Sequence, residues 1–145
     1  MPVAICRLER VAADNKGDIS ERMPAIPTEK NGKKIALVGA GPAALTVARD
    51  LAPLGYMLEL YDDQGKGGGF RRSQIPSFRL PEHVLDEEVN LVTDLGVTTH
   101  YNTYVDSLQS LLDKDYDAIF VGTGAPRGRD LSIPGREEAS ANINI

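Results

Sequence analysis

Apolar residues along this chain follow two patterns, short continuous runs and longer stretches in which they recur every three or four positions. Continuous runs are typical of strands buried on both faces of a parallel sheet, whereas the recurring spacing is typical of helices with one buried side. The runs predict strands at residues 35–38, 57–61, 97–101 and 116–121. The spacing predicts helices at residues 42–54, 81–96 and 106–112. This alternation predicts an α/β fold of three layers, with a parallel sheet in the strand order 3-2-1-4.

The two ends of the chain lack this alternation. Residues 3–13 predict a short amphipathic helix, and residues 14–32 are polar and interrupted by glycine and proline, a composition typical of a linker. Beyond the last predicted strand, residues 126–145 contain no element that would complete the sheet. We therefore expect an incomplete sheet that belongs to a larger protein.

The turn between the first strand and the following helix has the sequence "GAGPAA" at residues 39–44. Gly39 permits the sharp turn out of the strand, and Gly41 lets the backbone approach a pyrophosphate. The charge of a pyrophosphate suits the N–H groups and the positive end of a helix. Ala44 stands where a third glycine is common, and its small side chain still lets the helix pack closely on the strand. The turn predicts a Rossmann-like site for a dinucleotide.

An acidic residue at the end of the second strand supports this prediction. Asp62 lies 21 residues after Gly41, and its carboxylate can accept both hydroxyls of a ribose. Asp63 and Glu59 compete for this role, but Asp63 lies beyond the strand and Glu59 lies within it, so we favour Asp62. No arginine directly follows Asp62 to receive a 2′-phosphate, so we do not expect NADP at this site.

A second glycine cluster, residues 67–69, follows the acid and bears on the choice of cofactor. Such a segment can fold back over phosphates without obstructing side chains, whereas a simple nicotinamide site more often continues directly into a helix. The cluster therefore favours a flavin. Arg71, Arg72 and Arg79 follow, and one of them can reach a phosphate bidentately. For Arg71 and Arg72 the alternative is a solvated pair on a loop, and Arg79 is the better candidate for a defined contact.

The composition argues against several other functions. The net charge of −5 over 145 residues gives no reason to expect nucleic acid or an anionic membrane as a partner, and no apolar run approaches the length of a membrane span, so we expect a cytoplasmic protein. The single cysteine, Cys6, excludes an internal disulfide and a four-thiolate iron–sulfur cluster held by this chain alone. His83 and His100 stand apart from any ligand set. We expect no metal site and no catalytic acid, base or nucleophile.

Three stretches together resemble a known family. They are "GAGPAALTVARDLAPLGY", "GGGFRRSQIPSFRLPEHVLDEEV" and "YDAIFVGTGA". They are similar to the flavin-binding region of the glutamate synthase small subunit family, a region also present in dihydropyrimidine dehydrogenase and related NADPH-dependent flavin oxidoreductases. The resemblance covers about residues 33–136. The N-terminal "VAICRLERVAAD" is similar to the segment that closes the family's helical iron–sulfur domain, and "LSIPG" is similar to the segment that leads into its NADPH-binding domain.

The resemblance implies which residues hold FAD. They are Val38, Gly39, Ala40, Gly41, Pro42 and Ala43 at the first turn, Asp62, Asp63, Gly68, Gly69 and Phe70 after the second strand, and Arg79, Val105, Gly122 and Gly124 further along. Within this set Arg79 corresponds to a flavin contact, and Val105 corresponds to a backbone contact on the adenine side. Gly122 stands where the family usually has alanine.

The resemblance also implies a function and a division into domains. The complete parent protein would pass electrons from NADPH through FAD to iron–sulfur centres or to a large or catalytic partner subunit. The expected divisions are the end of an iron–sulfur domain at 1–13, a linker at 14–32, a partial FAD-binding domain at 33–136 and a lead-in to an NADPH-binding domain at 137–145. We expect the chain alone to be inactive. The alternative function is a non-catalytic module that binds a nucleotide or docks to a subunit.

Overall fold

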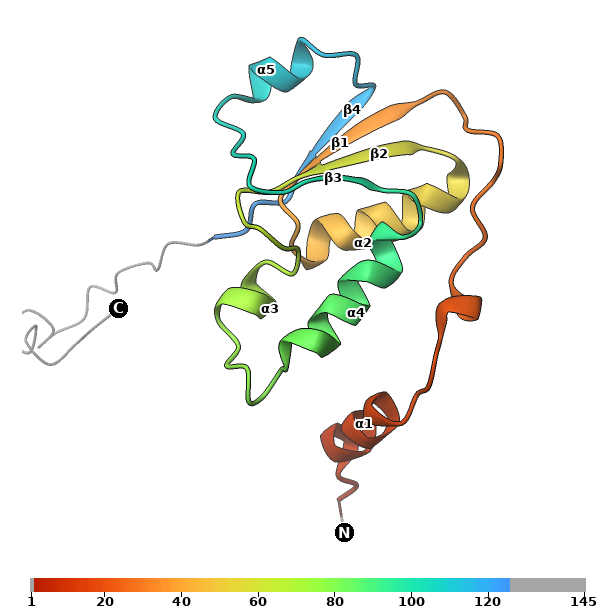
Figure 1. The fold of residues 1–145 in the computed structure, drawn as a ribbon, viewed down its shortest axis with the longest axis vertical. Helices are drawn as coiled ribbons and strands as arrows, with labels where there is room; N and C mark the ends of the chain where they lie inside the picture. Colours follow the sequence, from red (N-terminus) through yellow and green to blue (C-terminus); the bar gives the residue numbers. More distant parts are fainter. Residues whose placement is uncertain (1, 126–145) are drawn as a thin grey trace, which may run out of the picture.

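The computed structural model describes residues 2–125, and within them four strands form one parallel sheet (Figure 1). The strands are β1 (Lys34–Val38), β2 (Met57–Tyr61), β3 (Thr98–His100) and β4 (Ala118–Val121). Their order across the sheet is β3-β2-β1-β4, and each neighbouring pair is parallel. The predicted α/β class and strand order are therefore confirmed. The predicted lead-in at 137–145, with residues 126–136 of the expected FAD domain, lies outside the described residues.

The main helices also match the sequence pattern. They are α1 (Ile5–Asp14), α2 (Pro42–Leu51), which continues as the 3₁₀ turn η2 (Ala52–Leu54), α4 (Glu82–Thr93) and α5 (Leu108–Leu112). Two elements were not predicted, α3 (Phe70–Ser73) and the 3₁₀ turn η1 (Ser20–Arg22), because four and three residues are too few to show a helical period. None of the helices formed by residues 2–125 is both long enough and apolar enough to span a lipid bilayer.

The sheet separates two core clusters of unequal size. Alternate residues of a strand point to opposite faces, so Leu37 and Leu60 lie in the larger cluster together with residues of α2 and α4. The smaller cluster on the other face consists of Ala36, Val38, Tyr61 and Leu111. Figure 1 shows α2 and α4 together on one side of the sheet and α5 on the other. Three layers are present, and the layer that contains α5 is the thinner one.

The helix that follows the glycine turn is anchored closely to the sheet. Ala44 and Ala48 of α2 are fully buried, and their small side chains allow the helix backbone to approach the strands. The helix begins at Pro42, whose missing N–H has no helical partner at this position in any case. The chain leaves η2 through Gly55, which has a left-handed backbone with φ 84°. The turn before α2 is therefore attached to a helix that is buried against the sheet.

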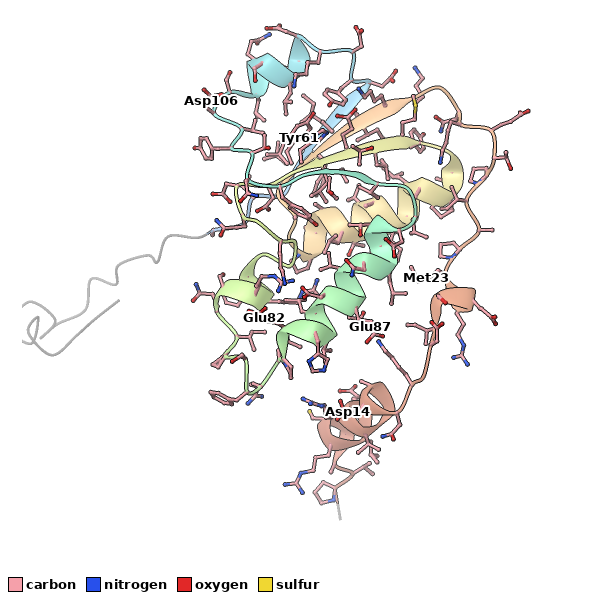
Figure 2. All side chains as sticks on the ribbon, in the orientation of Figure 1. Asp14, Met23, Tyr61, Glu82, Glu87 and Asp106 are labelled. Atoms are coloured by element: carbon pink, nitrogen blue, oxygen red, sulfur yellow. The ribbon has the colours of Figure 1, made fainter. Side chains whose placement is uncertain are left out.

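The N-terminal segment contacts the domain in a few places. Residues 2–15, which include α1, are exposed. Lys16 then forms ion pairs with Glu87 and Glu88 of α4, at 2.9 and 2.6 Å. Further along, Met23 and Ile26 pack against the larger core cluster, and Figure 2 shows Met23 on the segment that joins α1 to β1. Part of the predicted linker therefore lies against the domain.

Candidate dinucleotide-binding site

The turn after β1 contains two glycines with different structural demands, and Gly39 is the more constrained. Its backbone has φ 98°, a left-handed conformation that side chains disfavour, and its N–H donates to the carbonyl of Tyr61 at 2.7 Å. A Cβ atom added to Gly39 would lie 2.5 Å from the carbonyl oxygen of Gly122. The packing of β1 against the end of β4 therefore requires glycine at this position.

Gly41 differs because nothing within the described residues requires it to be glycine. It caps α2 with φ −78° and ψ 177°, which any residue can adopt. A Cβ atom at Gly41 would have the oxygen of Gly122, 3.9 Å away, as its nearest neighbour among the residues described. The backbone here borders open space at the start of a ten-residue helix.

This end of α2 offers partial positive charge. The first N–H groups of any helix have no helical acceptor, and within residues 2–125 no side chain caps α2. The aligned peptide dipoles add roughly half a positive charge at the same end. Ala43, in the first turn, is exposed, and Pro42 contributes no N–H. The end of α2 is therefore suited to an anionic group.

The structure brings Asp62 to the turn, as the sequence predicted. One carboxylate oxygen accepts the N–H of Ala40 within the turn, and the other accepts the N–H of Gln64 at 2.8 Å. Asp63 is exposed, and its carboxylate accepts a hydrogen bond from the Gln64 side chain at 3.0 Å. The choice of Asp62 over Asp63 as the acid beside the turn agrees with this geometry, although both oxygens of Asp62 already hold backbone N–H groups.

The second glycine cluster folds against the first turn. The N–H of Gly68 donates to the carbonyl of Ala40 at 2.8 Å. Gly69 lies so close to the turn that an added Cβ atom would be 2.8 Å from the Cα of Gly41. Both Gly68 and Gly69 have positive φ, at 126° and 53°. The backbones of the two glycine segments are therefore in direct contact.

The other predicted site residues divide into two groups. Gly122 joins the turn, since its N–H donates to the carbonyl of Val38 at 2.8 Å. An alanine Cβ at 122, the residue that the family resemblance implies here, would lie 2.8 Å from a ring carbon of Phe120 and would require the ring to shift. Gly124 follows with φ 72° and is exposed. The positions further from the turn are Phe70 and Arg79, which are exposed, and Val105, which packs in the smaller core cluster.

Glu59, the third acid considered for the ribose, is engaged elsewhere. It lies on the sheet face that carries α5, where it pairs with Lys34 at 2.6 Å and contacts the Tyr116 hydroxyl at 2.7 Å and His100 Nε2 at 3.0 Å. Tyr61 donates to the same carboxylate at 2.9 Å. Burial alone would raise the pKa of Glu59, but the hydrogen bonds from Lys34, Tyr116, Tyr61 and His100 outweigh burial and lower the pKa to about 2.

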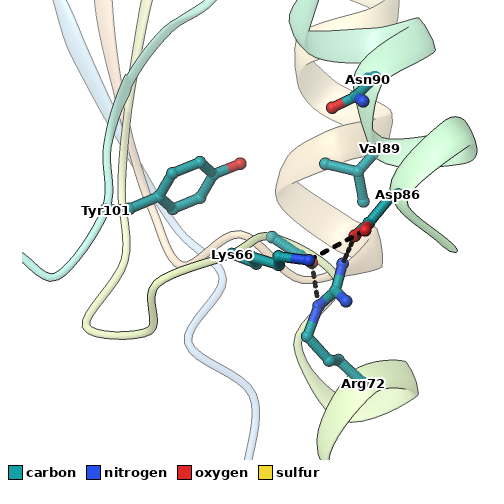
Figure 3. Close-up of a pocket in the computed structure, with 7 residues that line it drawn as sticks. Lys66, Arg72, Asp86, Val89, Asn90 and Tyr101 are labelled. Atoms are coloured by element: carbon teal, nitrogen blue, oxygen red, sulfur yellow. Dashed lines mark hydrogen bonds and ion pairs between the residues drawn. The ribbon is translucent and has the colours of Figure 1, made fainter. Parts of the chain in front are cut away.

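Sequence reasoning missed a cluster of charges behind the second glycine segment. Arg72 of α3 and Lys66 both pair with Asp86 of α4, at 2.6 and 3.0 Å. They line a cavity of about 200 Å³ together with Gly67, Val89, Asn90 and Tyr101 (Figure 3). The sequence signal for the pair is slight, since Arg72 and Asp86 are 14 positions apart in a stretch without regular spacing.

Comparisons with known proteins agree with a dinucleotide-binding site. No model of a protein family matches the chain. The NADP(+)-dependent formate dehydrogenase subunit beta of Moorella thermoacetica is 39% identical over 110 residues, which is 74% of this chain and 16% of the relative. The NADPH-Fe(3+) oxidoreductase subunit beta of Geobacter sulfurreducens is 35% identical over 94% of this chain and 21% of its own length. The glutamate synthase (NADPH) small chain of Bacillus subtilis is 33% identical over 93% of this chain and 28% of its own length.

Over most of its length, this chain is related to the glutamate synthase small chain and to similar oxidoreductase subunits. The family resemblance inferred from the quoted stretches is therefore confirmed. The chain spans only 16% to 28% of the three relatives, so it corresponds to one part of each.

A solved structure supports the fold of this chain. FprA from Mycobacterium tuberculosis, described in complex with NADPH, has a TM-score of 0.62 and 22% identity, and the match covers 72% of this chain and 25% of FprA. At this level of identity the likeness concerns the fold, and it agrees with the helix-flanked parallel sheet. Within residues 2–125 no group of three or more His, Cys, Asp or Glu side chains is arranged to hold a metal ion.

Proposed function

We propose that this chain binds FAD, with the diphosphate against the turn at Gly39–Gly41 and the start of α2. The observation that carries the proposal is Gly41. Packing within the described residues explains Gly39, but it does not explain Gly41, whose missing side chain borders open space beside an uncapped helix end. Close approach of a phosphate to the backbone accounts for glycine at such a position.

The residues around the turn would share the binding. The first N–H groups of α2 would face the diphosphate, and the backbone at Gly69, which lies against Gly41, would border it. Asp62 would accept ribose hydroxyls with the lone pairs that its bonds to Ala40 and Gln64 leave free, because each carboxylate oxygen can accept more than one hydrogen bond. Family resemblance adds Arg79, Val105, Gly122 and Gly124 as contacts of the flavin and adenine ends.

The activity of the complete parent protein is proposed from the names of the relatives. Those names describe subunits of NADP(H)-dependent oxidoreductases. We propose that the parent passes electrons from NADPH through FAD to iron–sulfur centres or a partner subunit. Bound FAD would supply redox chemistry that ordinary side chains lack, and the residues of this chain would bind and orient it.

The division of the parent into domains remains part of the same proposal. Residues 1–13 would form the end of an iron–sulfur domain, and residues 14–32 would link that domain to the FAD-binding domain. Residues 33–136 would form part of the FAD-binding domain, and residues 137–145 would lead into an NADPH-binding domain. The described residues contain one glycine turn of this type, which we assign to FAD. We therefore expect negligible NADPH oxidation by this chain with added FAD, and clear turnover in a steady-state assay would contradict that expectation.

Titration of FAD, NAD and NADP against thermal unfolding tests the binding proposal. A ligand present at about 100 times its Kd adds roughly 2.7 kcal/mol to the unfolding free energy, and we expect FAD alone to do so. The matched variant is Gly41→Ala, whose backbone and surroundings accept a Cβ atom. It should change the unfolding free energy by less than about 1 kcal/mol. Its Cβ would intrude on the diphosphate and weaken FAD binding by at least about tenfold.

Two results would count against the proposal. A chain that responds to none of the three nucleotides would favour a docking module over a cofactor site. A Gly41→Ala variant that binds FAD as tightly as the wild type would mean that the diphosphate does not lie at this turn.

A further inference from the structure

Arg72 connects the second glycine segment to α4. Its Nε donates to the carbonyl of Gly67 at 2.8 Å, and its Nη2 donates to a carboxylate oxygen of Asp86 at 2.6 Å. Figure 3 shows the guanidinium between the loop and the helix, with dashed lines to both partners. A single side chain thus fastens the backbone of the loop to a helix that is itself packed in the larger core cluster.

Asp86 receives a second cation, Lys66, at 3.0 Å. Hydrogen bonds from Lys66 and then Arg72 hold the pKa of Asp86 below its usual value, so the carboxylate stays charged near neutral pH. The two pairs differ in exposure, because the Arg72 side chain is 18% exposed and that of Lys66 is 54% exposed. Solvent weakens exposed ion pairs, so the pair with Arg72 is the stronger constraint.

The glycine loop needs such a constraint because it has no side chains of its own to pack. Glycine loses more conformational freedom on ordering than any other residue. The position of Gly67 is narrow, since an added Cβ atom would lie 2.9 Å from the Tyr101 hydroxyl and 3.0 Å from a methyl carbon of Val89. Two hydrogen bonds hold the backbone of the segment: the Gly68 N–H donates to the carbonyl of Ala40, and the Gly67 carbonyl accepts from Arg72 Nε.

We propose that Asp86 and Arg72 are positioning residues that hold Gly67, Gly68 and Gly69 against the Gly39–Gly41 turn. Arg72 then contributes to binding through the loop and does not contact the diphosphate. This inference rests on the proposed FAD function. It replaces both roles that the sequence left open for Arg72, a phosphate contact and a solvated pair on a loop, and it adds Asp86, which the sequence did not single out.

The geometry disfavours direct contact between Arg72 and a phosphate. Nε and Nη2 already have partners, and the Asp86 carboxylate beside them would repel an incoming anion. The remaining nitrogen, Nη1, is buried and has no protein partner among the described residues. A nitrogen that solvent does not reach would need a rearrangement of the loop before it could meet a ligand.

The variant Asp86→Asn separates the two roles because they predict effects of opposite sign. If Asp86 positions the loop, its loss weakens FAD binding on the order of tenfold, even though a negative charge has been removed. If Arg72 is a phosphate ligand restrained by Asp86, the freed guanidinium makes FAD bind more tightly. Glu87→Gln is the matched control, since it removes one charge from an exposed position on the same helix. Its small effect on the FAD Kd measures the general electrostatic contribution.

Amide hydrogen exchange supplies a second measurement that needs no ligand. In the ligand-free chain, Asp86→Asn should speed exchange of the Gly68 N–H by about tenfold, while the amides of Leu37 and Leu60 in the core strands keep their protection. Arg72→Lys should do the same, because lysine keeps the charge but lacks the planar fork that reaches two acceptors. A variant that merely lowered overall stability would speed all of these amides together.

The outcomes distinguish this inference from the proposed function. Unchanged Gly68 exchange in Asp86→Asn, or tighter FAD binding, would overturn the positioning role. Failure of the wild-type chain to bind FAD would overturn the proposed function and with it the contribution of the loop to binding. The exchange measurement would still decide whether Asp86 and Arg72 hold the loop.

Discussion

Two regions of the sheet are built from different chemical groups. One is the edge at the carboxyl ends of the strands, and the other is the face that carries α5. At the edge, backbone meets backbone, as in the bonds from Gly68 to Ala40 and from Gly122 to Val38. On the α5 face, side chains meet side chains around Glu59. Where backbone packs on backbone, as at Gly39 and Gly69, there is no room for an added Cβ atom, whereas a network of side chains depends on every member.

This difference separates a candidate binding surface from a structural network. The edge displays N–H groups at an uncapped helix end and leaves open space beside Gly41. On the α5 face, the carboxylate of Glu59 already has four partners within the chain, so its hydrogen-bonding capacity is used internally. Three further variants test the contrast.

The largest effect should come from adding one carbon at the edge. Gly39→Ala combines a disfavoured positive φ with overlap against the backbone of Gly122, and backbone cannot rotate away as a side chain can. We expect a loss of about 3–4 kcal/mol of unfolding free energy, measured in urea. Gly17→Ala is the control, because Gly17 has φ 63° but no atom within 4 Å of an added Cβ. It should cost about 1–2 kcal/mol, and equal losses in both variants would contradict the packing argument.

A slightly smaller loss of unfolding free energy should appear when low pH protonates Glu59 in the side-chain network. The pKa of Glu59 is about 2 in the folded chain and 4.5 in an unperturbed glutamate, so the unfolded state binds more protons between these values. The contribution of Glu59 is therefore complete above about pH 5 and is lost as the pH falls towards 2, with a total of about 3 kcal/mol. Unfolding free energies measured from pH 6 to 2.5 should show this loss, and Glu59→Gln should remove it.

Glu82→Gln serves as the control for the acid experiment, since the Glu82 side chain is 70% exposed. This variant should retain the acid-dependent loss seen in the wild type. If Glu59→Gln showed the same acid dependence as the wild type, the network would not be the source of the effect.

The smallest loss of unfolding free energy should come from Gly122→Ala, because the atom nearest the added Cβ would belong to a side chain. The added Cβ would lie 2.8 Å from the Phe120 ring, which is only partly buried and can shift. We expect a cost of about 1 kcal/mol. Phe120→Leu should relieve it, so a double-mutant cycle should give a coupling of about 1 kcal/mol, whereas additive losses would show that the ring is not the obstacle.

Much of the fold could be predicted because it depends on local spacing. Continuous apolar runs and helical spacing placed β1, β2, α2 and α4, and the parallel alternation led to the observed strand order. Asp62 could be placed at the turn because consecutive parallel strands end at the same edge. The short helix α3 could not be predicted, since four residues are too few to show a helical period.

The partners of individual charged side chains could not be predicted for a similar reason. Glu59 meets His100 and Tyr116, which are 41 and 57 positions away. The sequence shows that these groups exist, but pairing depends on which residues share a sheet face and how the strands align. Arg72 illustrates the same limit, because its basic character is evident while its two acceptors come from a loop and a helix.

Gly39 and Gly41, two glycines of one short motif, show what the sequence determines and what only the tertiary structure decides. In "GAGPAA" the order of residues was enough to indicate a strand, a tight turn and a helix, because φ preferences and apolar spacing act over a few positions. It could not show that Gly39 is required by the end of β4 while Gly41 faces open space. That distinction depends on what lies beside each Cα, and β4 is some 80 positions further along the chain.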